Sequence, residues 1–91
     1  MATVRTTVRL FASAREAAGA GEVALDVPVD AQGHTTTAQV LATLAEAVPA
    51  LAPLMASAML AVNMEYVRDR DVPFVLRTRD EVALIPPVSG G

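Results

Sequence analysis

The chain has 91 residues, of which 53% are hydrophobic and only 3% aromatic, so it suits one domain with a core of aliphatic side chains. A net charge of −3 excludes the basic surface that would attract nucleic acid or anionic lipid, and all seven cations are arginines. The lack of cysteine excludes disulfides, thiolate nucleophiles and zinc–sulfur sites. No secretion signal or membrane span is recognisable, which predicts a cytoplasmic protein.

The N-terminal part is predicted to form two strands separated by a short helical turn. Residues 4–11 alternate with period two, which is typical of a strand buried on one face. The side chains expected inward are Val4, Thr6, Val8 and Leu10, and those expected outward are Arg5, Thr7, Arg9 and Phe11. Residues 12–18 form the helical turn, ended by Gly19, and residues 22–27 form a second strand that Pro28 stops. The inward residues of the second strand are Val23, Leu25 and Val27.

One main helix follows a polar loop at residues 30–36. A threonine is its expected N-cap, namely Thr35, Thr36 or Thr37. Apolar residues then recur with helical spacing on one side, until Pro49 ends the helix. They are Val40, Leu41, Leu44 and Val48. Residues 50–58 are expected to form a turn or short helix that packs Leu51, Leu54 and Met55 onto the core.

Short strands complete the chain. We expect them at residues 59–62, 66–67 and 81–85, with a turn at 63–65 and a charged loop at 68–73. The apolar residues 74–76 are too few to assign. This order of elements predicts an α+β fold, in which one main helix packs across one face of a single sheet.

The other face of this sheet is a candidate interface. One helix covers only one face, so the second face must meet water or a partner. Alternation places three apolar residues there beside two arginines: Phe11, Ala83 and Ile85, with Arg5 and Arg9. Apolar side chains mixed with arginine are typical of interfaces, although single exposed apolar residues are also ordinary on protein surfaces. The sequence leaves both interpretations open.

Most catalytic constellations are excluded. The one histidine, His34, lies in a loop without a nucleophile or an orienting group nearby. The acidic residues between 65 and 81 alternate with arginines, as on a solvated surface, and lack the dense spacing of a cation site. The glycines at 19 and 21 precede a strand, which is the wrong context for a phosphate-binding loop. We therefore expect no metal, no bound cofactor and no catalytic machinery in this chain.

The C-terminal segment "IPPVSGG" is the most distinctive part of the sequence. Pro86 has no N–H to continue the sheet, and Pro86–Pro87 favours an extended segment that projects from it. We divide the chain into a domain at residues 1–87 and a flexible tail at residues 88–91. Glycines without a Cβ can enter a narrow channel, and the carboxylate of Gly91 becomes reactive once a partner converts it into an acyl-adenylate, then a thioester or thiocarboxylate.

Three blocks of the sequence closely resemble the small subunit of molybdopterin synthase, the MoaD family. They are "VRLFASAREAAG" (8–19), "LAVNMEYV" (60–67) and "DEVALIPPVSGG" (80–91). The resemblance implies a ubiquitin-like β-grasp fold and a sulfur-carrier role. A ubiquitin-activating-like adenylyltransferase would adenylate the terminal glycine with ATP, and a sulfur donor protein would supply the thiocarboxylate sulfur. The large subunit would hold the catalytic residues and pass the sulfur to cyclic pyranopterin monophosphate, in a heterotetramer of two small and two large subunits.

The resemblance also assigns roles to residues. Gly91 is the expected thiocarboxylate and acyl-adenylate carrier, with Gly90 as the adjacent threading residue. The expected partner-binding residues are Phe11, Arg15, Tyr66, Ile85, Pro86, Pro87, Val88 and Ser89. The family commonly has Asp-Gly-Asp where this chain has Thr78-Arg79-Asp80. If that turn needs a positive φ, replacing Arg79 with glycine should be neutral or stabilising.

Three alternatives remain open at this point. The chain could carry sulfur for another pathway, such as thiamine thiazole formation. It could be a ubiquitin-like protein modifier, because the same activated terminus permits attachment to lysine. It could also be a binding module with an inert tail. In the favoured interpretation the chain is a non-catalytic, sulfur-donating subunit.

Overall fold

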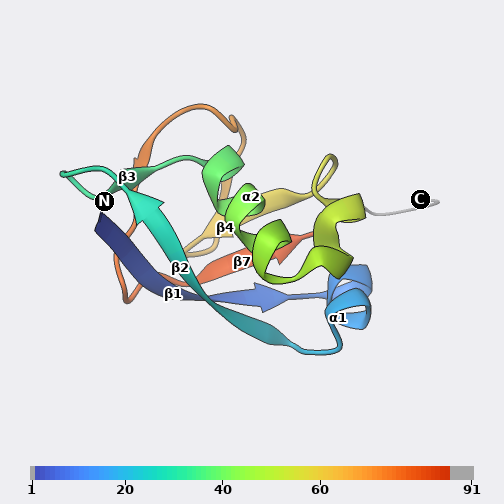
Figure 1. The fold of residues 1–91 in the computed structure, drawn as a ribbon. Coiled ribbons are helices and arrows are strands. Elements are labelled where there is room, and N and C mark those ends of the chain that lie inside the picture. Colours follow the sequence, from blue (N-terminus) through green and yellow to red (C-terminus); the bar gives the residue numbers. More distant parts are fainter. Residues whose placement is uncertain (1, 87–91) are drawn as a thin grey trace.

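A mixed five-stranded sheet forms the centre of the molecule, and the main helix packs across one face of it (Figure 1). The computed structural model describes residues 2–86, and the structural statements below concern these residues. The elements in chain order are β1 (Ala2–Leu10), α1 (Ala12–Ala18), β2 (Glu22–Val29), β3 (His34–Thr35), α2 (Thr37–Ala47), the 3₁₀ helix η1 (Pro49–Leu54), β4 (Met59–Val62), β5 (Glu65–Val67), β6 (Phe74–Val75) and β7 (Val82–Ile85). The expected tail at 88–91 lies outside the described residues, so the division of the chain after residue 87 stays a prediction.

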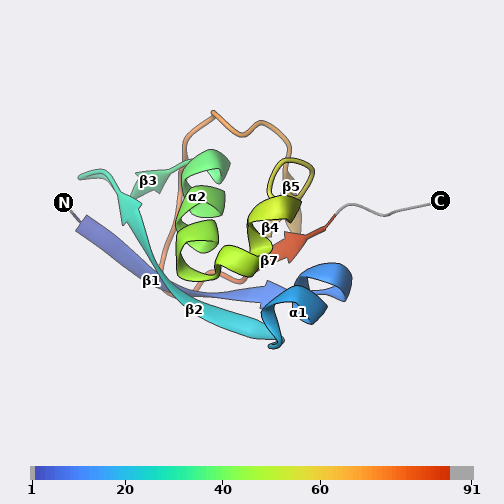
Figure 2. The same cartoon turned by 45° about the vertical axis from the view of Figure 1, so that its right-hand side comes forward.

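The strand order of the sheet is β2-β1-β7-β4-β5. The first and last strands, β1 and β7, run parallel in the middle, and every other pair in the sheet is antiparallel. Helix α2 lies across this sheet, and η1 and α1 lie beside each other at the end where β7 finishes (Figure 2). The α+β layout with one covered sheet face, predicted from the sequence, is confirmed.

The core lies between α2 and the inward residues of the sheet. Val40, Leu41 and Leu44 of α2 are buried, as helical spacing predicted. The strand residues of the core cluster are Val8, Leu10, Leu25, Val27, Leu60, Val82 and Leu84. Thr36 is the N-cap of α2, and its hydroxyl accepts a hydrogen bond from the Gln39 N–H at 3.1 Å. These inward positions were assigned correctly because each strand keeps strict alternation.

Strand β2 does not stop at Pro28, so the sequence prediction was wrong there. The strand continues to Val29 and pairs with β1 over its whole length. In an antiparallel ladder, hydrogen-bonded and non-hydrogen-bonded residue pairs alternate. Leu10 and Gly21 form a hydrogen-bonded pair, and Thr3 and Pro28 lie seven pairs further along, so they form a non-hydrogen-bonded pair. The missing N–H of Pro28 therefore points away from β1, and β2 is an edge strand with no second neighbour in the sheet.

The polar loop at 30–36 contains a strand that local sequence did not indicate. His34 and Thr35 form β3, which pairs with β6 in a separate two-stranded sheet. The Asp30 carboxylate organises the approach to β3 by accepting hydrogen bonds from the N–H groups of Gln32 and His34, both at 2.9 Å. The paired residues are 39 and 41 positions apart in the chain, so periodicity in a short window could not have revealed the pairing.

We expect this loop to lose stability in acid. The hydrogen bond from the His34 N–H is the main cause that holds the pKa of Asp30 below its usual range. The hydrogen bond from the Gln32 N–H also lowers this pKa. A lowered pKa stabilises the fold at pH values above the ordinary aspartate range, and this stabilisation is lost as the pH falls through the folded-state pKa. The melting temperature of Asp30→Asn should therefore lie below that of the native chain at neutral pH, and the gap should close in strong acid. A gap that is independent of pH would contradict this account.

Two tight turns differ in the φ angles of their backbone. Asn63 and Met64, between β4 and β5, have φ of 52° and 69°, the positive values of a type I′ hairpin turn. Arg79 is not among the described non-glycine residues with positive φ. Its turn is closed by the Asp80 N–H donating to the Arg77 carbonyl at 3.0 Å. The expected gain from a glycine at position 79 was therefore wrong, because this turn does not use the left-handed region.

The two turns provide a matched pair of glycine substitutions. Met64→Gly should stabilise the protein by about 0.5–1 kcal/mol, because Met64 is 90% exposed and the relief of its left-handed strain outweighs the added entropy of the unfolded chain. Arg79→Gly should destabilise it by about 0.5–1 kcal/mol through the added entropy of the unfolded chain. Thermal melting of both variants measures the difference. Shifts of the same sign would show that the backbone of these turns does not control the outcome.

Candidate functional site

The sheet face opposite α2 carries a cluster of apolar side chains beside the end of β7. One lateral row across it is Arg9, Ala83, Ala61 and Tyr66, from β1, β7, β4 and β5. In the next row Ile85 pairs with Met59, and Phe11 lies beside Ile85 because Leu10 pairs with Leu84. We define the docking face as the six apolar residues of these rows: Phe11, Met59, Ala61, Tyr66, Ala83 and Ile85.

The large side chains of the docking face are exposed although they are apolar, whereas Ala61 between them is buried. Tyr66 is 58% exposed, Phe11 46% and Met59 40%, whereas Leu84, on the opposite side of the same sheet, is fully buried. Ala83 and Ile85 are half-buried between their neighbouring strands. A contiguous patch of large apolar side chains at one end of an uncovered sheet is typical of a surface that binds another protein.

The chain leaves the sheet directly beside this face. Strand β7 ends at Ile85, and the following Pro86 is buried and has no N–H for the ladder. We call this point, Ile85–Pro86, the chain exit. A partner that covers the docking face is therefore positioned to receive the residues that follow.

The strand pairings place two of the predicted site residues, Tyr66 and Ile85, on the same sheet face. Two more, Phe11 and Pro86, directly follow the last residues of β1 and β7. The other C-terminal ones, Pro87, Val88, Ser89, Gly90 and Gly91, lie outside the described residues, and their roles stay predictions. Met59 and Ala61 were not among the predicted site residues. The alternation of residues 59–62 about the buried Leu60 could have placed them on the open face.

The fifth predicted residue in the described part, Arg15, lies at the edge of the docking face. The Phe11 carbonyl accepts hydrogen bonds from the N–H groups of Ala14 and Arg15, at 3.0 and 3.3 Å, so α1 starts directly after the docking face. The Arg15 guanidinium packs over Gly21, where a Cβ would lie 3.7 Å from Cζ. Ala12, between Phe11 and Ala14, has a positive φ of 48°, and this left-handed residue turns the chain from β1 into α1.

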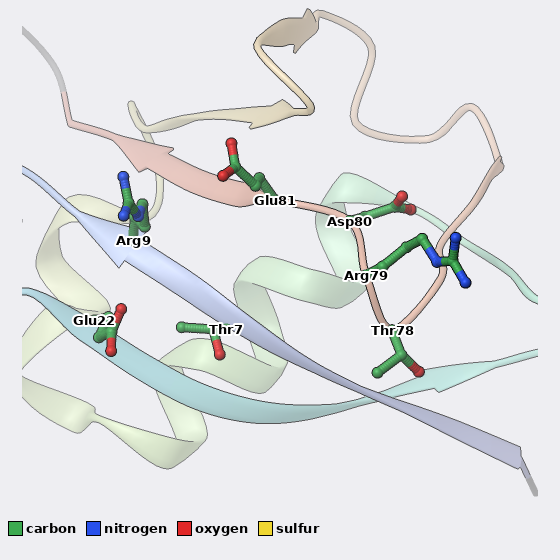
Figure 3. A pocket seen from close by; sticks show the side chains of 7 residues that line it. All are labelled: Thr7, Arg9, Glu22, Thr78, Arg79, Asp80 and Glu81. Atoms are coloured by element: carbon green, nitrogen blue, oxygen red, sulfur yellow. The ribbon is translucent and has the colours of Figure 1, made fainter.

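The other end of the same sheet face is polar (Figure 3). A shallow cleft there is lined by Thr7, Arg9, Glu22, Thr78, Arg79, Asp80 and Glu81. Asp80 has a structural role, since its carboxylate accepts hydrogen bonds from Asn63 Nδ2 at 3.0 Å and from the Arg77 N–H at 2.8 Å. Asn63 Oδ1 in turn accepts from the Glu81 N–H at 2.9 Å, which joins the β4–β5 turn to the start of β7.

The described part of the site consists of the docking face and the chain exit. Within residues 2–86, no three histidine, cysteine, aspartate or glutamate side chains cluster in a way that could hold a metal ion. None of the helices in this part of the chain combines the length and apolar character that a membrane crossing requires. The features that the structure describes at this site are therefore the exposed apolar side chains and the position where the chain leaves the sheet.

Comparison with known proteins shows the family to which the chain belongs. The model of the ThiS family matches residues 8–91. The chain belongs to the ThiS family. A molybdopterin synthase sulfur carrier subunit from Chlamydomonas reinhardtii is 42% identical to this ThiS-family chain, over 92% of the chain and 95% of the relative. The resemblance to the small-subunit family seen in the sequence is confirmed.

Solved structures support the fold of this ThiS-family chain. The small archaeal modifier protein SAMP1 from Methanosarcina acetivorans superimposes with a TM-score of 0.75 at 27% identity, over all of both chains. A chain from the complex of subunits 1 and 2 of the molybdopterin-converting factor from Helicobacter pylori matches with a TM-score of 0.59 at 19% identity. That match covers 97% of this chain and all of the other, and it bears on the fold alone. The predicted ubiquitin-like β-grasp is confirmed.

Proposed function

We propose that this chain is the sulfur carrier subunit of a molybdopterin synthase. The name of the Chlamydomonas relative, 42% identical over nearly its full length, supports this assignment. The structural observation that carries it is the position of the chain exit. Ile85 belongs to the docking face, and the next residues lead to Gly90–Gly91, so one binding event would capture both the surface and the terminus.

In this proposal the chemistry takes place on the carboxylate of Gly91. An activating enzyme transfers AMP from ATP to this carboxylate and releases pyrophosphate. A sulfur donor protein then delivers sulfur to the acyl carbon, AMP leaves, and Gly91 becomes a thiocarboxylate. In the large subunit this sulfur passes to cyclic pyranopterin monophosphate, and the carboxylate is regenerated.

In this proposal the chain contributes the surface that binds the partner and the terminus that carries the sulfur. The docking face supplies apolar area, and Arg15 adds a cation at its edge. The five residues 87–91 span at most about 17 Å, which lets the terminus enter a partner while the domain stays on its surface. Gly90 and Gly91 have no Cβ to obstruct a narrow channel or to shield the acyl carbon from attack. We assign the catalytic groups to the large subunit and ATP binding to the activating enzyme.

Deletion of Gly91 tests the proposal. The native chain, incubated with its activating enzyme, ATP and a sulfur donor, should gain the mass of one sulfur-for-oxygen exchange in intact-protein mass spectrometry. The chain without Gly91 should melt at the same temperature and gain no such mass. A normally folded native chain that releases no pyrophosphate and forms no thiocarboxylate would overturn the assignment, and so would full complementation of a small-subunit-deficient strain by the deletion.

A role as a protein modifier is the second candidate, favoured by the full-length similarity to SAMP1. It requires the same activation of Gly91 but ends in a bond to a lysine of another protein. An N-terminally tagged copy expressed in cells should then give a set of larger conjugates that disappear when Gly91 is deleted.

Complementation of strains that lack the molybdopterin or the thiazole sulfur carrier separates the two sulfur-transfer pathways.

A further inference from the structure

All seven cationic side chains of this protein are arginines, and none of its 91 residues is lysine. The two residues carry the same charge but differ in reactivity. An arginine guanidinium stays protonated in proteins, so its nitrogens do not act as nucleophiles. A lysine loses its proton far more readily, and its free amine attacks activated acyl groups. This difference matters in a chain whose proposed function places an activated acyl group at its own terminus.

Arg15 lies near the chain exit on the β2 side of the sheet. Its guanidinium packs over Gly21, whose carbonyl accepts a hydrogen bond from the Leu10 N–H at 2.9 Å. Leu10 is in register with Leu84 of β7. Gly21 and Leu84 are therefore two strand spacings apart in one lateral row, which is about 10 Å.

Arg68 lies near the chain exit on the opposite side. It is exposed and directly follows Val67, the last residue of β5. Val67 is in register with Leu60, and Leu60 is in register with Leu84, so β5 is also two spacings, or about 10 Å, from β7. Arg15 and Arg68 thus flank the chain exit at similar distances.

Both positions are within reach of the terminus. Residues 87–91 can span about 17 Å from Pro86, more than the lateral separation of either arginine from β7. A group tethered over such a span has an effective concentration in the millimolar range, about a thousandfold above a micromolar protein solution. An amine at either position would therefore compete with the groups of a partner for the activated terminus.

We infer that arginine at positions 15 and 68 keeps positive charge beside the chain exit without a nucleophile, so the activated terminus is not consumed by its own chain. The inference rests on the proposed function. The reaction avoided is attack of a lysine nitrogen on the Gly91 acyl carbon. The new C–N bond forms as the bond to AMP or to sulfur breaks, AMP or the thiol leaves, and the nitrogen loses a proton. The product is an internal isopeptide, one water lighter than the free chain, which can no longer carry sulfur.

The test uses the full chain carrying a small-molecule thioester at Gly91, with no partner protein present. Arg15→Lys and Arg68→Lys are compared with the native chain and with Thr3→Lys. Thr3 is an exposed residue of β1, seven positions before Leu10, and Pro86 lies two residues beyond the register partner of Leu10, Leu84. These nine residues correspond to about 30 Å along the strands, which is out of reach of the terminus. At mildly alkaline pH, intact mass distinguishes the hydrolysed chain from the isopeptide, and peptide mapping locates the bond.

We expect the native chain to give hydrolysed product alone, and Thr3→Lys to form at most a slow background of isopeptide. Arg15→Lys and Arg68→Lys should form internal isopeptide at a rate independent of protein concentration, about tenfold or more above the Thr3→Lys control. Isopeptide at the control rate in both folded variants, or an equal rate of self-acylation in the native chain, would overturn the inference. Because this thioester needs no activating enzyme, such a failure is separate from a failure of Gly91 adenylation, which pyrophosphate release reports.

Discussion

Met59→Asp should weaken binding to the large subunit of molybdopterin synthase by about thirtyfold, a loss of about 2 kcal/mol. Met59 is 40% exposed in the free chain and is in register with Ile85, next to the chain exit. Once a partner covers the docking face, an aspartate at this position would be a carboxylate removed from water with no cation paired to it. Calorimetric titration with the purified large subunit measures the change in Kd.

Val75→Asp is the matched control for this experiment. Val75 is also a strand residue and is 39% exposed, but it lies in β6, which belongs to the separate two-stranded sheet. The same substitution there should leave the Kd unchanged within about twofold, and both variants should melt close to the native chain. Equal losses of affinity in the two variants, or none in Met59→Asp, would show that the partner does not use the docking face.

Arg70→Ala should lower the free energy of unfolding by about 2–3 kcal/mol, or about 10–20 °C in melting temperature for a chain of this size. The Nη2 group of Arg70 donates hydrogen bonds to the carbonyls of Met55, Ala56 and Ala58, at 2.8, 3.1 and 2.8 Å. The Arg70 carbonyl accepts a bond from the Ala38 N–H at the start of α2. One side chain therefore joins the 68–73 loop to the segment between η1 and β4.

Arg68→Ala provides the comparison, because Arg68 is two residues away, exposed and makes no side-chain hydrogen bond within residues 2–86. It should change the free energy of unfolding by less than about 0.5 kcal/mol. Arg70→Lys should recover only part of the loss, since an ammonium on a flexible stem replaces a planar guanidinium. Similar melting curves for Arg68→Ala and Arg70→Ala would mean that the three carbonyls are satisfied by water when the guanidinium is removed.

The bonds of Arg70 also show where sequence reasoning stopped. The 68–73 loop was interpreted as a solvated charged surface, and for Arg68 that is correct. Arg70 has the same residue type two positions later, yet it is bound to three backbone carbonyls. Local composition and charge spacing cannot distinguish a solvated arginine from one that binds the carbonyls of a distant turn, because the acceptors come from a segment 12 to 15 residues earlier in the chain.

The amino-acid sequence by itself determined the local structure and the reactive chemistry. Alternation identified the inward residues of β1, β2 and β7, a threonine marked the start of α2, and the C-terminal Gly90–Gly91 indicated the proposed carrier group. The choice of arginine over lysine is likewise a property of the sequence alone. These features depend on residue type and on neighbours within one or two turns, so they can be interpreted without knowing the fold.

The tertiary structure alone decided which surfaces meet. The parallel pairing of β1 with β7 brings Phe11 beside Ile85, and the pairing of β4 with β7 adds Met59 to the same face. The order of the strands also makes β2 an edge strand, which is why Pro28 is tolerated within it. Pairing depends on burying one continuous core between strands that are far apart in the chain, and local periodicity carries no information about which strand becomes a neighbour.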